Sequence, residues 1–184
     1  MSDPAPQLNS SEIRGLVEQA QEHNKAAFEE LYRSFYTPLH RYLFGILNNR
    51  EDAEEAYQEA LFNTWTSLPT LRSSKHFRSW LYKIATNAAL ARLRKQKSTE
   101  FPLDVAQDLT PRVPFEERLE EAELITLSLA QVPLKYRISL LLHIEGFPHH
   151  EIASILEISE KSVSTYISSG RKVFRQAYKA LNEK

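Results

Sequence analysis

The sequence predicts an all-α protein that consists of two small helical domains joined by a flexible linker. Good helix formers such as Leu, Ala, Glu, Lys and Arg dominate the 184 residues, and glycine occurs only four times. Apolar residues recur at helical spacing through most of the chain. Residues 98–115 break this pattern with three prolines and more acids than bases. We therefore expect one domain over residues 1–97, an acidic linker over 98–115 and a second domain over 116–184.

Residues that typically begin or end helices predict the first helices of the N-terminal domain. Ser10 or Ser11 is expected to cap the first helix, because serine side chains accept hydrogen bonds from the free backbone amides at a helix start. Helical spacing resumes at Lys25, and Pro38 is expected to start or kink the helix that follows. The two asparagines at 48–49 are expected to interrupt the helical pattern.

Two further helices and one loop complete this domain. A helix is expected to begin near Glu51, whose charge suits the first turn, and to end before Pro69. A loop over Thr70–His76 leads into a long helix over Phe77–Lys97.

The second domain is expected to contain four helices. The first covers residues 116–129, the second begins at Pro133, and Gly146 ends it. Pro148 suits the first position of a short helix, since its fixed backbone angle is helical. Ser159 is expected to cap the final helix.

The net charge is only −1, but acidic and basic residues are concentrated in separate segments of the chain. No acid occurs between Ala60 and Thr99, where there are eight bases, whereas residues 51–59 contain five acids and no base. Residues 100–123 contain eight acids, and residues 161–184 contain six bases and one acid. The sequence therefore predicts two basic surfaces separated by acidic ones, which favours contact with nucleic acid.

Several classes of protein are excluded by composition and motifs. The chain has no cysteine, so disulfides and cysteine nucleophiles are absent. The first residues lack an apolar signal core, and no stretch approaches the roughly 20 apolar residues that span a bilayer. No glycine-rich phosphate loop or Ser-His-Asp arrangement is present. We expect a soluble, cytoplasmic protein that is not an enzyme, holds no cofactor and does not insert into a membrane.

Two clusters of polar residues could be read as a metal site or a catalytic site. His143, His149 and His150 invite a metal site, but adjacent histidines point to different faces of a helix and no fixed carboxylate set accompanies them. Asp52, Glu54 and Glu55 are consecutive acids without a histidine at helical spacing, which favours an exposed docking surface over a catalytic cluster. We expect no metal ligands and no catalytic residues.

The segment Pro148–Arg175 predicts a helix-turn-helix. Two helices are separated by a short turn, with Ala153 small at their crossing and Ile158 in the turn. Hydroxyl and cationic side chains on the outward face of the second helix suit base edges and phosphates. An ordinary helical hairpin would give the same spacing. The outward residues are Lys161, Ser164, Thr165, Ser168, Arg171, Lys172 and Arg175.

A second nucleic-acid surface is expected over residues 68–97. Phe77, Trp80 and Tyr82 lie among basic residues, and such mixtures can neutralise phosphates and stack on unpaired bases. The alternative is that Trp80 and Phe77 are core residues.

The chain resembles the sigma factors of the extracytoplasmic-function (ECF) type, which contain only the region 2 and region 4 domains. The resemblance covers roughly residues 25–97 and 115–180 and is carried by five motifs in family order. These are FEELY at 28–32, DAEE at 52–55, QEALF at 58–62, FRSWLYKIATN at 77–87 and VPLKYR at 132–137, the last leading into the helix-turn-helix.

The resemblance implies a transcription initiation factor that binds core RNA polymerase, directs it to promoters and helps to melt the minus-ten element. An acidic helix would dock on the β′ clamp helices, the second domain would meet the β flap, and the linker would follow the RNA exit path. The implied core-binding residues are Asp52, Glu55, Gln58, Glu59 and Phe62.

The resemblance also implies two promoter-binding sets and a regulator. A base flipped from the minus-ten element would enter the 71–76 loop, and the final helix would contact the minus-thirty-five element. An anti-sigma factor is the expected regulator. The minus-ten residues are Leu71, Arg72, Ser73, Ser74, Lys75, His76, Phe77, Arg78, Trp80, Lys83 and Asn87. The minus-thirty-five residues are Lys161, Ser162, Ser164, Thr165, Ser168, Arg171 and Lys172.

The sequence departs from the family pattern at a few positions. Glu157 stands where a turn glycine is frequent, and Leu71 stands where an aromatic residue is frequent. Ser164, Tyr166 and Ser169 replace common basic residues, which predicts fewer phosphate contacts and weaker binding. This cation-poor helix supports the alternative of a sigma-like interaction module that binds a regulator or core polymerase without productive promoter recognition.

Overall fold

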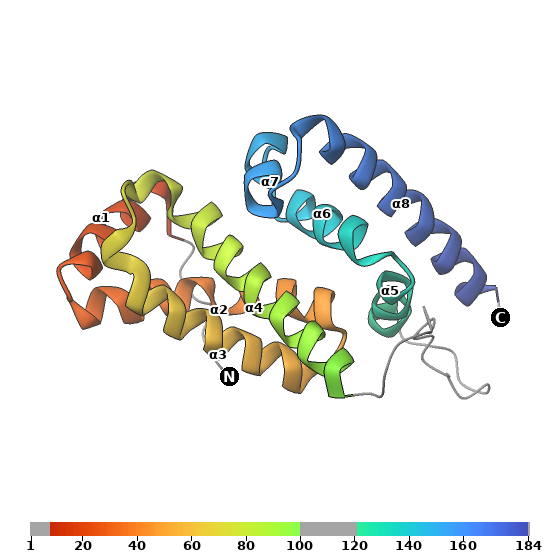
Figure 1. Ribbon diagram of the computed structural model, residues 1–184, viewed down its shortest axis with the longest axis horizontal. Coiled ribbons are helices and arrows are strands. Elements are labelled where there is room, and N and C mark those ends of the chain that lie inside the picture. The colour runs from red at the N-terminus through yellow and green to blue at the C-terminus, as the bar shows by residue number, and fades with distance from the viewer. Residues whose placement is uncertain (1–7, 100–120, 184) are drawn as a thin grey trace.

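The computed structural model describes residues 8–99 and 121–183, and within these ranges it contains helices and no strand. Helices α1–α4 form one unit and α5–α8 form a second unit beside it (Figure 1). The all-α, two-unit prediction is confirmed. Most of the predicted linker and the start of the helix expected from residue 116 lie outside the described residues.

The first helix is capped one residue earlier than expected. Helix α1 covers Ser10–Gln21, and the Asn9 side chain accepts hydrogen bonds from the amides of Ser11 and Glu12 at 2.9 and 3.0 Å. The Glu12 carboxylate accepts from the Asn9 amide at 2.7 Å and closes a capping box. The expectation that Ser10 or Ser11 is the cap was wrong, because asparagine satisfies the same free amides from the position before them.

The second helix is continuous through its proline. Helix α2 covers Lys25–Leu47 and contains Pro38 in its interior, so Pro38 does not start a helix. It ends at Asn48, whose left-handed backbone (φ 52°) breaks the helical path, and Asn49 then caps α3 (Arg50–Ser67). Packing of α2 against α1, α3 and α4 compensates for the hydrogen bond that a proline removes.

The remaining helices match the predicted pattern with small shifts of their ends. Two short 3-10 turns, η1 (Leu68–Thr70) and η2 (Ser74–His76), connect α3 to α4 (Phe77–Thr99). The second unit contains α5 (Glu121–Ala130), α6 (Leu134–Ile144), α7 (His149–Leu156) and α8 (Glu160–Asn182).

Caps and turns of the second unit are mostly as expected. Pro148 precedes the first residue of α7 as its N-cap and does not occupy the first helical position. Ser159 caps α8 as predicted, since its hydroxyl accepts from the Ser162 amide at 3.3 Å. Glu157 adopts the left-handed conformation (φ 55°) at the turn where glycine was expected to be frequent.

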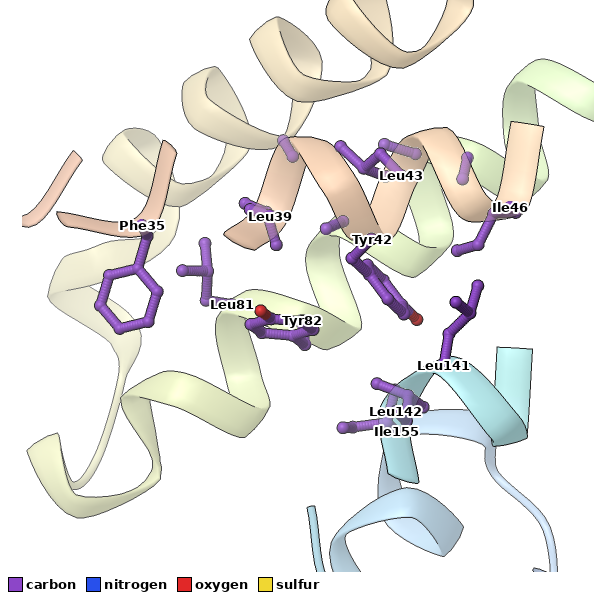
Figure 2. Packing of buried hydrophobic residues seen from close by; sticks show 14 of the residues in the cluster. Phe35, Leu39, Tyr42, Leu43, Ile46, Leu81, Tyr82, Leu141, Leu142 and Ile155 are labelled. Atoms are coloured by element: carbon purple, nitrogen blue, oxygen red, sulfur yellow. The ribbon is translucent and has the colours of Figure 1, made fainter. Parts of the chain in front are cut away.

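The two units share one hydrophobic core. Leu141 and Leu142 of α6 and Ile155 of α7 face the buried side chains of α2 and α4, including Tyr42, Ile46 and Tyr82 (Figure 2). All six residues are at most 9% exposed. Because burying a large aliphatic side chain contributes about 1.5–3 kcal/mol, this contact stabilises the side-by-side arrangement of the units.

Gly45 permits the closest approach between the two units. A Cβ atom at this position of α2 would lie 3.0 Å from both methyl groups of Leu141. Glycine is unfavourable inside a helix, so its presence here is explained by the need for α6 to pack directly on α2.

Candidate nucleic-acid interface

One face of α3 is exposed, acidic and partly apolar. Glu55, Gln58, Glu59 and Phe62 follow each other at helical spacing and all are solvent-exposed. Phe62 is 68% exposed, which is unusual for a large aromatic side chain beside carboxylates. We name this set the α3 docking face, and its composition suits contact with a basic protein surface that also has an apolar patch.

Asp52 does not belong to the exposed docking face. It is only 8% exposed, and its carboxylate accepts hydrogen bonds from Arg92 and, at 2.7 Å, from Gln96 of α4. Arg92 also binds Glu55, and these carboxylates raise the pKa of Arg92 mainly through the Asp52 hydrogen bond. The expectation of an exposed Asp52 is wrong, because α4 covers this turn of α3 and uses its charge to join the two helices.

The loop between α3 and α4 is held in place by α1. The Gln21 amide donates to the main-chain oxygens of Leu68 and Leu71 at 3.1 and 2.8 Å. The Ser74 hydroxyl donates to Glu18 at 3.0 Å. Gln21 and Glu18 were missed by sequence reasoning, because a glutamine or glutamate on a helix surface shows no local sign of a partner about fifty residues away.

Side chains of the loop remain accessible. Arg72, Lys75 and His76 are exposed, and Leu71 is half-buried. A fixed backbone with free cationic side chains suits a segment that must hold an unpaired base and its phosphate. Ser73 and Ser74, the other predicted loop residues, are also half-buried.

The aromatic residues at the start of α4 have different surroundings. Phe77 is 2% exposed and packs edge-on against Phe35 with ring centres 5.7 Å apart. Phe77 is therefore a core residue that anchors the loop, not a surface that contacts DNA. Trp80 is half-buried, with its ring centre 6.2 Å from that of Phe77, while Asn87 is exposed further along α4.

The basic residues Arg78 and Lys83 of α4 face the second unit. The Arg78 guanidinium donates to the main-chain oxygen of Glu145 and lies 4.3 Å from the centre of the Phe147 ring. Lys83 forms an ion pair with Glu157 at 2.8 Å. The residues between α6 and α8 thus occupy part of the α4 surface that was predicted to contact the minus-ten element.

Glu145 connects three residues of the first unit. Its carboxylate accepts from the Tyr82 hydroxyl at 2.9 Å and from Arg41 at 3.2 Å, in addition to the Arg78 contact with its main-chain oxygen. Only 8% of its side chain is exposed. Burial, followed by the nearby Glu145 charge, raises the pKa of Tyr82, so this phenol stays a donor. Sequence reasoning missed Glu145, because its partners come from 63 to 104 residues away.

The outward face of α8 is open. Val163 and Ile167 are buried, and a Cβ at Gly170 would lie 3.0 Å from the main-chain oxygen of Tyr136, so this face of α8 packs closely on α6. Ser162 is half-buried and its hydroxyl lies 2.7 Å from that of Ser159, so it serves the helix cap. The other predicted minus-thirty-five residues are exposed: Lys161, Ser164, Thr165, Ser168, Arg171 and Lys172.

A basic pocket of about 550 Å³ lies beside this open face. It is lined by His143, His149, Ser164, Ile167, Ser168, Arg171, Lys172, Arg175 and Gln176, with no carboxylate among them. Over residues 8–99 and 121–183, no three His, Asp or Glu side chains are grouped as metal ligands would be. In the same ranges no helix is long and apolar enough to cross a bilayer.

Comparisons with known proteins match both units. A family model described as Sigma-70 region 2 matches residues 31–99, and one described as Sigma-70, region 4 matches residues 122–173. The ECF RNA polymerase sigma factor SigW of Bacillus subtilis is 27% identical, with 92% of this chain and 98% of SigW covered. SigM of Mycobacterium tuberculosis is 26% identical over 80% of this chain and 75% of its own length.

Two solved structures have a similar fold. CnrH, in complex with the cytosolic domain of CnrY, superposes with a TM-score of 0.67 at 20% identity, covering 92% of this chain and 98% of CnrH. The sigma factor RpoE of Bartonella quintana, in complex with the anti-sigma factor NepR, has a TM-score of 0.67 at 16% identity over 83% of this chain and 96% of RpoE.

Proposed function

The chain belongs to the sigma-70 family as a transcription initiation factor of the ECF type, and we propose how its surfaces direct core RNA polymerase to a promoter. The main support is that the same chain has an exposed acidic face on α3, a basic α4 without acids, and a helix-turn-helix whose second helix has an exposed outward face. No chemical step is assigned to this chain, because the polymerase forms the RNA bonds.

The α3 docking face is proposed to bind the β′ clamp helices of core polymerase. Glu55 and Glu59 supply negative charge, and Phe62 supplies an aromatic side chain that can be buried at the centre of an interface. Asp52 supports this face indirectly, because its contact with Arg92 holds α3 against α4. The second unit is proposed to meet the β flap.

Promoter DNA is proposed to contact two separate surfaces. The 71–76 loop and the exposed side of α4, including Trp80 and Asn87, would hold the melted minus-ten strand. Phe77 acts by anchoring the loop. The exposed side chains of α8 would contact bases and phosphates of the minus-thirty-five element in the major groove.

Use of the α4 surface requires movement of the second unit. Arg78 and Lys83 are engaged by residues of the second unit, so they cannot neutralise phosphates in this arrangement. We infer that core polymerase separates the two units when it binds them at different sites. An arrangement in which α4 is partly covered suits a factor that should not bind DNA before it meets the polymerase.

An anti-sigma factor is the proposed regulator. Both structural neighbours were solved with such a partner or a cytosolic domain of another protein. A protein that binds both units at once would hold the arrangement seen here and keep α4 covered.

Run-off transcription with purified core polymerase and fragmented genomic DNA of the source organism tests this function. We expect transcripts with defined start sites that depend on the added chain. A chain that binds core polymerase but yields no promoter-dependent transcript would contradict the proposal and favour the sigma-like interaction module.

Charge reversal within the docking face tests its assignment separately. The double variant Glu59→Lys with Phe62→Ser should lower affinity for core polymerase by at least about tenfold, since it reverses one charge of the face and removes its exposed aromatic side chain. Glu30→Lys reverses an equally exposed acid on α2 and is the matched control. Equal affinities for the two variants would contradict the docking assignment.

A further inference from the structure

The basic pocket beside α8 is formed by three helices of the second unit. His143 comes from the end of α6, His149 is the first residue of α7, and Arg171 lies near the middle of α8. Lys172 and Arg175 complete a rim of cations. Because the lining contains no carboxylate, the pocket suits an anion and does not suit a metal cation.

His143 holds Arg171 over the pocket. Their side-chain nitrogens lie 2.7 Å apart, and an arginine can only donate, so His143 must be neutral and accept through Nε2. Burial, together with the charge of Arg171 and the nearby His149, lowers the pKa of His143 and favours this neutral form. The arginine is thus oriented before any ligand arrives, which reduces the entropy lost on binding.

His149 adds a second donor from a different helix. Its ring centre lies 6.2 Å from that of His143, and its side chain is exposed. In a helix-turn-helix the first helix crosses the DNA backbone while the second enters the major groove. The pocket therefore lies where a phosphate would pass between the two helices, next to Ser164 and Ser168 of the outward face.

We propose that this pocket binds a backbone phosphate of promoter DNA beside the minus-thirty-five element, with Arg171 and His149 as donors and His143 as the positioning residue for Arg171. The inference rests on the proposed role of α8 in DNA binding. It explains how an α8 face with Ser164 and Ser169 at commonly basic positions still gains phosphate contacts: α7 supplies a donor, His149, and α6 supplies His143, which orients Arg171.

A double-mutant cycle, measured by binding to short mixed-sequence duplex DNA, tests the proposal. Mixed sequence is suitable because a phosphate contact does not depend on the base sequence. The full chain is measured by fluorescence anisotropy at several salt concentrations. Arg171→Ala should make the slope of log affinity against log salt concentration shallower by about one, the value expected for the loss of one phosphate contact. The double variant His143→Leu with His149→Ala should lower affinity roughly threefold to tenfold, and this loss should be clearly smaller in the Arg171→Ala background, since His143 acts only through Arg171 and His149 binds the same phosphate.

Two further variants separate positioning from packing. His143→Gln keeps an acceptor for Arg171 and should retain most of the affinity, whereas His143→Leu keeps the volume but removes the acceptor. His150→Ala is the control, because His150 is the exposed neighbour of His149 and does not line the pocket.

Several outcomes would overturn the phosphate site. These are additive losses in the cycle, equal losses for His143→Gln and His143→Leu, and an effect of His150→Ala as large as that of the double variant. A wild-type chain that binds no duplex would overturn it as well. The proposed function is tested separately by run-off transcription, which depends on core polymerase and can succeed while the pocket variants have no effect.

Discussion

The two helices that we propose contact DNA, α4 and α8, are both basic in sequence but differ in how much of their charge is exposed. The cations Arg78 and Lys83 of α4 are engaged by Glu145, Phe147 and Glu157 of the second unit. The cations of α8 are exposed, and three of them line an open pocket: Arg171, Lys172 and Arg175. A basic stretch therefore indicates potential for DNA binding, and only the packing of neighbouring elements shows whether that potential is available.

The difference also suggests an order of events. The outward face of α8 is open in the arrangement seen here, whereas the part of α4 that carries Arg78 and Lys83 becomes fully accessible only when the units separate. If the contact between the units controls α4, then changes at that contact should affect single-strand binding by α4 and leave duplex binding by α8 unchanged.

The largest separation of the two units is expected from a bulky substitution at the contact between them. Gly45→Leu places a bulky side chain where even a Cβ lies 3.0 Å from Leu141, and overpacking costs about 1–3 kcal/mol. We expect the units to separate, seen as a larger radius of gyration by small-angle X-ray scattering and as stronger binding of mixed-sequence single-stranded DNA.

Gly15→Leu is the matched control for Gly45→Leu. Gly15 also lies inside a helix, but a Cβ there meets no atom within 4 Å. Both changes replace a helical glycine and should favour the helix to a similar degree. If the two variants show the same radius of gyration, the α2–α6 contact does not hold the units together.

A smaller opening is expected from Glu145→Gln. The substitution keeps the shape of the side chain but removes the charge that Arg41 and Tyr82 bind. Hydrogen bonds to charged groups contribute about 1.5–3 kcal/mol each, so the ratio of closed to open molecules should fall by roughly tenfold or more. Single-molecule energy transfer between dyes on α3 and α8 would measure this ratio, and an unchanged ratio would show that Glu145 does not act as a latch.

The comparison of α4 with α8 can be tested with one lysine on each helix. Lys83→Ala should not change DNA affinity in the wild-type chain, because Lys83 is paired with Glu157, but it should weaken single-strand binding severalfold in the Gly45→Leu background. Lys172→Ala should weaken duplex binding equally in both backgrounds. A loss for Lys83→Ala in the wild-type chain would mean that α4 is already accessible.

The smallest effect is expected at the exposed ion pair between the units. Lys83 lowers the pKa of Glu157 from its ordinary value of 4.5, first through a hydrogen bond and then through charge. The pair therefore stabilises the contact above pH 4.5 and loses its contribution as the pH falls through the lowered pKa. Glu157→Gln at neutral pH should change the closed fraction much less than Glu145→Gln does, because exposed ion pairs contribute little.

Most elements of the fold could be predicted from the sequence, because helices are determined by local signals. The Ser159 cap and the outward face of α8 each depend on residues only a few positions apart. Pro38 does not start a helix, because packing allows it inside α2, and Asn9 caps α1 in place of Ser10 or Ser11. The shift of the cap is expected, since asparagine and serine are nearly equal as N-caps, whereas an interior proline costs about 3 kcal/mol and depends on the packing of α2.

The site could be predicted in outline but not in detail. The outward residues of α8 were identified by helical spacing, whereas Gln58, Glu59 and Phe62 of the α3 docking face came from the family resemblance. Asp52 was expected to be exposed, yet α4 covers it. The resemblance placed Phe77 in the minus-ten set while a core role stayed open, and its packing against Phe35 supports the core role. Periodicity identifies the residues that share a face, and it does not reveal which other helix will pack on that face.

The sequence by itself determined the helical character, the two-unit organisation, the family and the alternation of acidic and basic blocks, because each depends on local spacing or composition. Only the tertiary structure decided which charges are free. In the folded chain Glu145 contacts Arg41 and Tyr82, His143 contacts Arg171, and Asp52 contacts Arg92. The partners in these contacts are 28 to 104 positions apart in the sequence. These pairings depend on how whole helices pack, and that information is not present in any short segment of the chain.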